Sequence, residues 1–134
     1  MIIHWSNDLS VGVEAIDADH HELLALLAAT PAGDGPAFIG HFGVIADHLV
    51  AHFSREEALM TKSRFFATEQ HRYEHRQVLD RVAVLRRQAE TSDPAPARIW
   101  LSEGLPDWFI GHLNTMDLAT AHFIRQNGGC GATA

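Results

Sequence analysis

The sequence contains a single cysteine, Cys130, close to its carboxyl end. One cysteine cannot form a disulfide within the chain, so a disulfide framework is excluded. The absence of disulfides is typical of reducing compartments, and we expect a cytoplasmic protein. With 134 residues the chain is long enough to bury one hydrophobic core unaided. We expect one domain over residues 1–127, followed by a flexible glycine-rich tail over residues 128–134.

Basic side chains are scarce in the first half of the chain. Residues 1–67 hold nine acidic and three basic side chains, which gives −6, and residues 68–134 hold eight and seven, which gives −1. The net charge of −7 argues against nucleic acid or an anionic membrane as a partner. Long apolar runs and the basic start of a signal peptide are also lacking, so we expect no contact with a membrane.

Apolar residues recur at helical spacing over four segments, residues 16–29, 36–61, 67–90 and 94–126. Short connections between these segments favour an all-α fold, an up-down-up-down antiparallel four-helix bundle after an extended N-terminal arm. Gly104 and Pro106 lie inside the last segment. Because proline removes a helical hydrogen bond, we expect a kink near residues 102–106, or a short helix that ends there before a new one starts at Pro106.

Histidine is over-represented, with ten residues. Five of them, together with two carboxylates, stand at spacings that bring them to inward helical faces: His20, His52, Glu56, His71, His75, His112 and Asp117. His71 and His75 lie four residues apart and so share one face, as do His52 and Glu56. A single histidine on an apolar stripe is more often a hydrogen-bonded core residue than a metal ligand. Burying all seven without a metal, however, costs several kcal/mol in unsatisfied polar groups.

The number of donors favours a two-metal site. Imidazole suits iron, copper, zinc and nickel, and a carboxylate can bridge two ions. Five imidazoles are too many for one tetrahedral zinc ion. Two six-coordinate ions that share two carboxylates and one oxo or hydroxo bridge need six terminal ligands, whereas the chain offers five. One coordination position therefore stays open for a small molecule.

Asp117 is the least regular member of the set. Five residues of a regular helix turn by roughly 140°, so His112 and Asp117 do not share a face. Either the helix contains a π-bulge between them, or the short aspartate reaches in from the flank. We predict a distorted helix between His112 and Asp117.

These motifs resemble the hemerythrin family, in particular its single-domain bacterial members. The resemblance covers most of the chain and rests on Trp5, Val11–Val13, Ile16–His20, His52–Met60, His71, His75, Trp108, His112 and Asp117. It implies that two iron ions are the cofactor and that the protein is not an enzyme. No large apolar stripe is left over, so we expect a monomer. Its implied function is the reversible binding of dioxygen, or of another small diatomic or anionic ligand, for storage, delivery or sensing.

The resemblance also implies a role for each residue. His71, His75 and His112 would hold one iron, and His20 and His52 would hold the other, whose sixth position stays open. Glu56 and Asp117 would bridge the two ions together with an oxo or hydroxo group. Apolar side chains would line the pocket around the open position: Leu23, Leu27, Leu49, Phe53, Leu113 and Met116.

His48 departs from the family pattern, in which many relatives carry tyrosine. It lies one turn before His52 and faces the same way. One interpretation is that His48 is an outer hydrogen-bond partner of the ligands, or a bundle histidine whose hydrogen bonds are all made within the bundle. The other is a pocket histidine that protonates the bound ligand or caps the open iron. That interpretation supports the alternative function, a di-iron enzyme acting on peroxide, dioxygen or nitric oxide. Iron handling or signalling is a third class.

Overall fold

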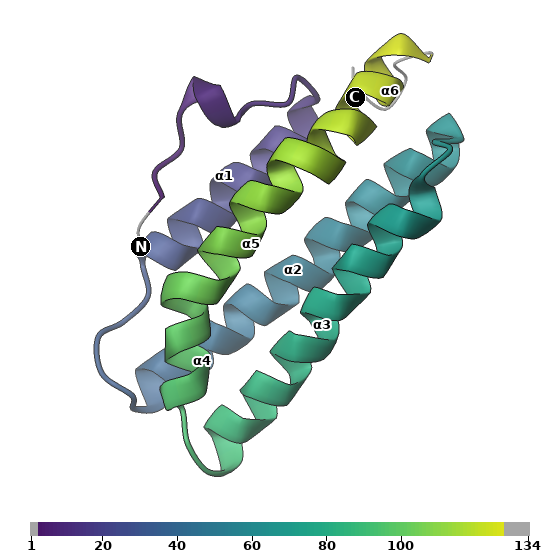
Figure 1. Cartoon of the computed structure of the whole chain (residues 1–134). Coiled ribbons are helices and arrows are strands. Elements are labelled where there is room, and N and C mark those ends of the chain that lie inside the picture. The colour runs from purple at the N-terminus through teal and green to yellow at the C-terminus, as the bar shows by residue number, and fades with distance from the viewer. Residues whose placement is uncertain (1–2, 128–134) are drawn as a thin grey trace.

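The computed structural model describes residues 3–127, which form four helical rods packed antiparallel, with no strand among them (Figure 1). The elements are the 3-10 turn η1 (Asn7–Leu9), α1 (Glu14–Ala28), α2 (Pro36–Ser63), α3 (Thr68–Thr91), α4 (Ala95–Ile99), the π-helical segment η2 (Trp100–Gly104), α5 (Leu105–His112), the π-helical segment η3 (Leu113–Asp117) and α6 (Leu118–Gln126). The predicted all-α bundle and its short N-terminal arm are confirmed. The predicted flexible tail and Cys130 lie outside the described residues.

Among residues 3–127, no helix combines the length and the apolar character that crossing a bilayer requires.

Local chemistry explains where the first helices end. The Thr30 hydroxyl donates to the Leu27 carbonyl at 2.8 Å, which satisfies one of the free carbonyls at the end of α1. Pro36 is the first residue of α2, a position where its missing N–H group costs no helical bond. Arg64 ends α2 in the left-handed region, with φ 59° and ψ 44°, a conformation that usually selects glycine.

The fourth rod is continuous from α4 to α6 but contains two π-helical segments. The first, η2, ends two residues before Pro106, and the Leu105 N–H reaches back five residues to the Trp100 carbonyl. The predicted distortion near residues 102–106 is therefore a widened turn inside one rod. Gly104 permits this turn, because a Cβ there would lie 2.6 Å from the Trp100 side chain.

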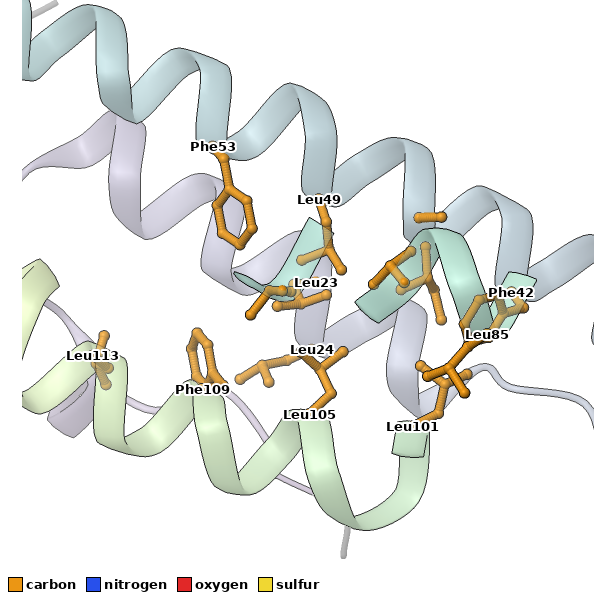
Figure 2. Packing of buried hydrophobic residues seen from close by; sticks show 14 of the residues in the cluster. Leu23, Leu24, Phe42, Leu49, Phe53, Leu85, Leu101, Leu105, Phe109 and Leu113 are labelled. Atoms are coloured by element: carbon orange, nitrogen blue, oxygen red, sulfur yellow. The ribbon is translucent and has the colours of Figure 1, made fainter. Parts of the chain in front are cut away.

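The hydrophobic core draws on all four rods, and Figure 2 shows its part around Leu49 and Phe109. Val13, Ala121 and Ile124, at the start of α1 and in α6, also belong to it. Phe53 and Leu49 of α2 point toward Phe109 and Leu105 of the fourth rod, with Leu23 and Leu24 of α1 between them. Phe53 and Phe109 are 2% and 1% exposed. These two rings border a polar cluster inside the bundle.

The N-terminal arm is tied to both the first and the last helix. Asp17 of α1 accepts hydrogen bonds from the Ser10 hydroxyl at 2.6 Å and the Val11 N–H at 2.8 Å. From α6, Arg125 donates to the Val11 carbonyl at 2.9 Å and packs over Gly12, whose φ is +83°. The arm thereby fixes the start of α1, which carries His20.

Candidate metal centre

All four rods contribute to one buried polar cluster. His20 comes from α1, His52 and Glu56 come from α2, and His71 and His75 come from α3. The fourth rod adds a histidine at the end of α5 and an aspartate at the end of η3. We call the full set the histidine–carboxylate cluster: His20, His52, Glu56, His71, His75, His112 and Asp117. Each member is at most 4% exposed, so the structure brings all seven predicted residues together in the interior.

The five imidazoles all direct Nε2 toward the two carboxylates. In three of the rings, Nδ1 contacts a residue outside the cluster. His71 Nδ1–H donates to the Thr120 hydroxyl at 2.7 Å. His75 Nδ1–H donates to Glu57 at 2.9 Å, and His112 Nδ1–H donates to Glu74 at 2.8 Å. The carboxylates of Glu57 and Glu74 can only accept, so they place a proton on Nδ1 of His75 and of His112, and Nε2 of each of these rings can bind a cation.

The two oxygens of Glu56 face different histidines. Glu56 Oε1 lies 3.2 Å from Nε2 of both His71 and His75. Glu56 Oε2 lies 2.6 Å from His52 Nε2 and 3.5 Å from His20 Nε2. The carboxylate therefore spans two sets of nitrogen donors, which we call the three-histidine group (His71, His75 and His112) and the two-histidine group (His20 and His52).

Asp117 divides its oxygens in the same way. Its Oδ1 lies 3.1 Å from Nε2 of both His71 and His112, in the three-histidine group. Its Oδ2 lies 3.1 Å from His20 Nε2, in the two-histidine group. One side of the cluster thus offers three nitrogens and two oxygens, and the other offers two nitrogens and two oxygens.

Several atoms of the cluster lack the partners that buried polar atoms require. Among the described residues, His75 Nε2, Glu56 Oε1 and both Asp117 carboxylate oxygens have no hydrogen-bond partner. Nε2 of His71 lies 3.0 Å from Nε2 of His112, a distance that requires either a shared proton or a cation beside the two nitrogens. The donor set therefore fits cations that bind imidazole and carboxylate together.

The two carboxylates stay ionised in the metal-free chain. Burial favours the neutral acid, but contacts with His52, His20 and His71 outweigh burial and hold the pKa of Glu56 well below its usual value. At Asp117, burial and the charge of Glu56 both favour protonation, yet the adjacent histidines lower its pKa. Two buried anions in one cluster form a strong cation site.

Two histidines of the cluster respond in the opposite direction. Burial disfavours their protonated form, but the close contacts with the negative charges of Asp117 and Glu56 outweigh it and raise the pKa of His20 to about 9. The same balance raises the pKa of His71 to about 9. In the metal-free chain, protons on these rings compensate the carboxylates, and an incoming metal ion has to displace them.

The predicted distortion of the last helix is confirmed. The segment η3, from Leu113 to Asp117, is π-helical. A hydrogen bond in a π-helix joins residues five apart, whereas one in an α-helix joins residues four apart. Asp117, five residues after His112, therefore returns to the face that carries His112. The extra residue in this turn brings the carboxylate into the cluster.

Aromatic and aliphatic side chains form the apolar wall of the cluster. Phe53 stacks on His75 with ring centroids 3.9 Å apart, and Phe109 meets His20 edge-on at 5.0 Å. Leu23, Leu49 and Leu113, which were expected to line the site, are buried, and Met116 is half-buried.

The prediction for Leu27 is wrong. Leu27 shares a helical face with His20, but seven residues place it about 10 Å farther along α1. It lines a separate cavity of about 250 Å³ with Pro31, Leu101 and Pro106 near the other end of the bundle. The helical period correctly predicted its face but not its level in the bundle.

His48 is engaged by α1. Its Nε2 donates to the Asp19 carbonyl at 3.1 Å, and its Nδ1 lies 3.1 Å from a carboxylate oxygen of Glu22. Burial and the neighbouring His52 lower the pKa of His48, which favours the neutral ring. The bond from Nε2 to the Asp19 carbonyl ties the ring to α1, which agrees with the interpretation of His48 as a hydrogen-bonded bundle histidine.

Sequence reasoning missed the outer partners Glu57, Glu74 and Thr120, as well as Phe109. Glu57 follows Glu56 directly in the chain. Its spacing from the predicted ligands carries no signal, because its partner His75 lies on another helix. Phe109 was detectable, since it lies three residues before His112 and therefore on the same face.

The comparisons with known proteins agree with this geometry. Residues 11–120 match the model of the hemerythrin HHE cation binding domain. A bacteriohemerythrin of Ralstonia nicotianae is 33% identical over 127 residues, which cover 95% of this chain and 92% of the relative. A bacteriohemerythrin of Stenotrophomonas maltophilia is 28% identical over 94% of this chain and 84% of the relative. No solved structure matches. Four antiparallel helices, a buried histidine–carboxylate cluster and a domain match over most of the length together show that the chain belongs to the hemerythrin family.

Proposed function

We propose that this chain is a non-haem di-iron protein that binds dioxygen reversibly. One observation carries the proposal: the two sides of the cluster offer different numbers of donors. The three-histidine group has five donor atoms within reach and the two-histidine group has four, because each carboxylate gives one oxygen to each side. With one shared oxo or hydroxo bridge, an ion held by the three-histidine group would be six-coordinate, and an ion held by the two-histidine group would retain one open position.

The donor types favour iron. Five imidazole nitrogens and two bridging carboxylates suit a redox-active transition metal better than Mg²⁺ or Ca²⁺, which prefer oxygen. The names of the two relatives, both bacteriohemerythrins, support the same assignment. When bound, a pair of ferrous ions supplies the two electrons that dioxygen accepts on binding.

The protein's part is to hold the donors and exclude water. Thr120, Glu57 and Glu74 fix three of the imidazole rings from outside. Phe53 and Phe109 cover the side that faces the core, and Met60, which is fully buried, lies one turn beyond Glu56. A dry, apolar surround withholds protons from a reduced ligand and so favours its release as dioxygen.

Metal analysis with optical spectroscopy tests the proposal. The protein is reconstituted anaerobically with ferrous iron, analysed for metal, exposed to air and then returned to vacuum. We expect two irons per chain, a charge-transfer band that appears in air, and its loss on removal of oxygen. One iron per chain, or a band that never reverses, would contradict reversible binding by an iron pair.

An enzyme acting on peroxide, dioxygen or nitric oxide was the alternative, with His48 as the acid or base. The contacts of His48 with Asp19 and Glu22 turn its nitrogens to α1 and do not favour that role. Rapid catalytic consumption of peroxide or nitric oxide by the reconstituted protein would restore this alternative.

A further inference from the structure

The outer partners of the cluster are distributed unequally between its two sides. In the three-histidine group, two of the three imidazoles donate to carboxylates, His75 to Glu57 and His112 to Glu74. In the two-histidine group, Nδ1 of His20 and Nδ1 of His52 have no hydrogen-bond partner among the described residues. Only one side of the cluster thus has anionic outer partners.

The acids near the two-histidine group do not compensate for this difference. Asp19 precedes His20, but Arg55 holds its carboxylate with two hydrogen bonds of 2.8 and 2.6 Å. Glu22 contacts His48, which is not in the cluster, and its side chain is 63% exposed. Neither carboxylate accepts a hydrogen bond from His20 or His52 in the described structure.

Glu57 and Glu74 are placed where their charge is effective. Their side chains are 26% and 30% exposed, so water screens them less than a fully exposed acid. A carboxylate that accepts the Nδ1 proton increases the electron density of the ring and makes its Nε2 a stronger donor. A stronger donor stabilises the higher charge of the metal ion that it binds.

We propose that Glu57 and Glu74 make the iron held by the three-histidine group the first of the pair to be oxidised. The inference rests on the proposed function, since it requires iron at both sides. One ferricyanide ion removes one electron from the iron pair and is reduced to ferrocyanide. The ferric ion then lies at the three-histidine group, and the ion beside the open position stays ferrous. Both glutamates act through the histidines and are positioning residues.

The two glutamates are expected to differ in strength. Arg72 Nε lies 3.5 Å from Glu57 and offsets part of its charge. Glu74 contacts His112 at the shorter distance of 2.8 Å. Glu74→Gln should therefore raise the first midpoint potential more than Glu57→Gln does. For Glu74→Gln we expect the equilibrium constant for the first one-electron oxidation to fall roughly tenfold. This change corresponds to a rise of about 59 mV in the first midpoint potential.

Glu22→Gln is the matched control, because it also removes one carboxylate charge but on the side of the two-histidine group. Potentiometry with ferricyanide and Mössbauer spectra of the half-oxidised protein are recorded for the wild type, both variants and the control. Within the cluster, the two glutamates contact only ligands of the three-histidine group. The Mössbauer quadrupole doublet that changes in Glu74→Gln therefore identifies the iron at that side. Glu57→Gln reports the same doublet if Glu74→Gln does not fold.

The inference predicts that the changed doublet is the ferric one and that the first potential rises in both variants but not in the control. A changed ferrous doublet, an unchanged potential, or an equal rise in Glu22→Gln overturns it. A wild-type chain that does not hold two irons overturns the proposed function as well, and metal analysis detects that outcome beforehand.

Discussion

At the scale of single residues, Glu56 has the largest effect on the cluster. It contacts four of the five cluster histidines and is almost fully buried. We predict that Glu56→Gln lowers the affinity for metal by more than about 100-fold, beyond the loss typical of an outer partner. Equilibrium dialysis against ferrous iron or cobalt measures the change. Glu69→Gln is the control, since Glu69 is 83% exposed, and it should bind as the wild type does.

His48 provides a second test at this scale. His48→Leu removes the hydrogen bond to the Asp19 carbonyl that joins α2 to α1. We predict a loss of about 1 kcal/mol in the free energy of unfolding but no change in the lifetime of the oxygenated protein. His48→Gln, which keeps a donor, should recover part of the stability. A longer-lived oxygenated form in His48→Leu would show that the ring reaches the ligand after all.

At the scale of elements, the π-helical segment η3 leads to a prediction about chain length. Deleting Asn114, an exposed residue of η3, leaves a four-residue step from His112 to Asp117. Four residues of a regular helix return to the same face within roughly 40°. We predict that the shortened chain folds and still binds metal, with reduced affinity because the carboxylate moves along the axis.

The matched control is the deletion of Tyr73, which is 57% exposed and lies between His71 and His75. That deletion rotates one ring away by roughly 100° and should abolish binding, since α3 is regular. Circular dichroism and metal content distinguish the two deletions. Equal loss of metal in both deletions would show that the angular position of residues around the helix axis does not explain why Asp117 reaches the cluster.

The turn between α2 and α3 offers a stabilising change. Arg64 adopts a left-handed conformation, which costs a residue with a side chain about 1 kcal/mol. Arg64→Gly should raise the free energy of unfolding by about that amount, whereas Arg64→Ala should not. Urea denaturation measures both, and metal content should stay unchanged because the turn lies outside the cluster.

At the scale of the whole molecule, metal binding and protonation compete. His20 and His71, with pKa values raised to about 9, both carry a second proton and a positive charge on the metal-free chain at neutral pH. Metal binding releases these protons, so the affinity should fall as the pH decreases from about 9 toward 6.5. Calorimetry in buffers of different ionisation enthalpy counts the released protons. A pH-independent affinity over this range would contradict the protonated state of the metal-free cluster.

The bundle and the positions of the seven cluster residues were predictable because both depend on period and spacing within one helix. The π segment η3 was predictable for the same reason, since a five-residue step contradicts a regular helix. Glu57, Glu74 and Thr120 were not, because their partners lie on other helices and depend on how two rods are rotated against each other. The error at Leu27 has a related cause: a period predicts the face of a side chain, not its level in the bundle.

The outer carboxylates also determine the charge balance of the interior. Glu56 and Asp117 lie inside the cluster, and Glu57 and Glu74 bond to its rim, so four negative charges surround the metal positions. Two divalent cations would bring four positive charges, which would balance these four carboxylates and make the filled interior inexpensive to bury. Each electron removed from the metals would add one positive charge, which the oxo or hydroxo bridge could balance only in part and no side chain of this set could balance. With iron bound as proposed, the oxidised protein should therefore attract small anions to its open position that the reduced protein does not retain.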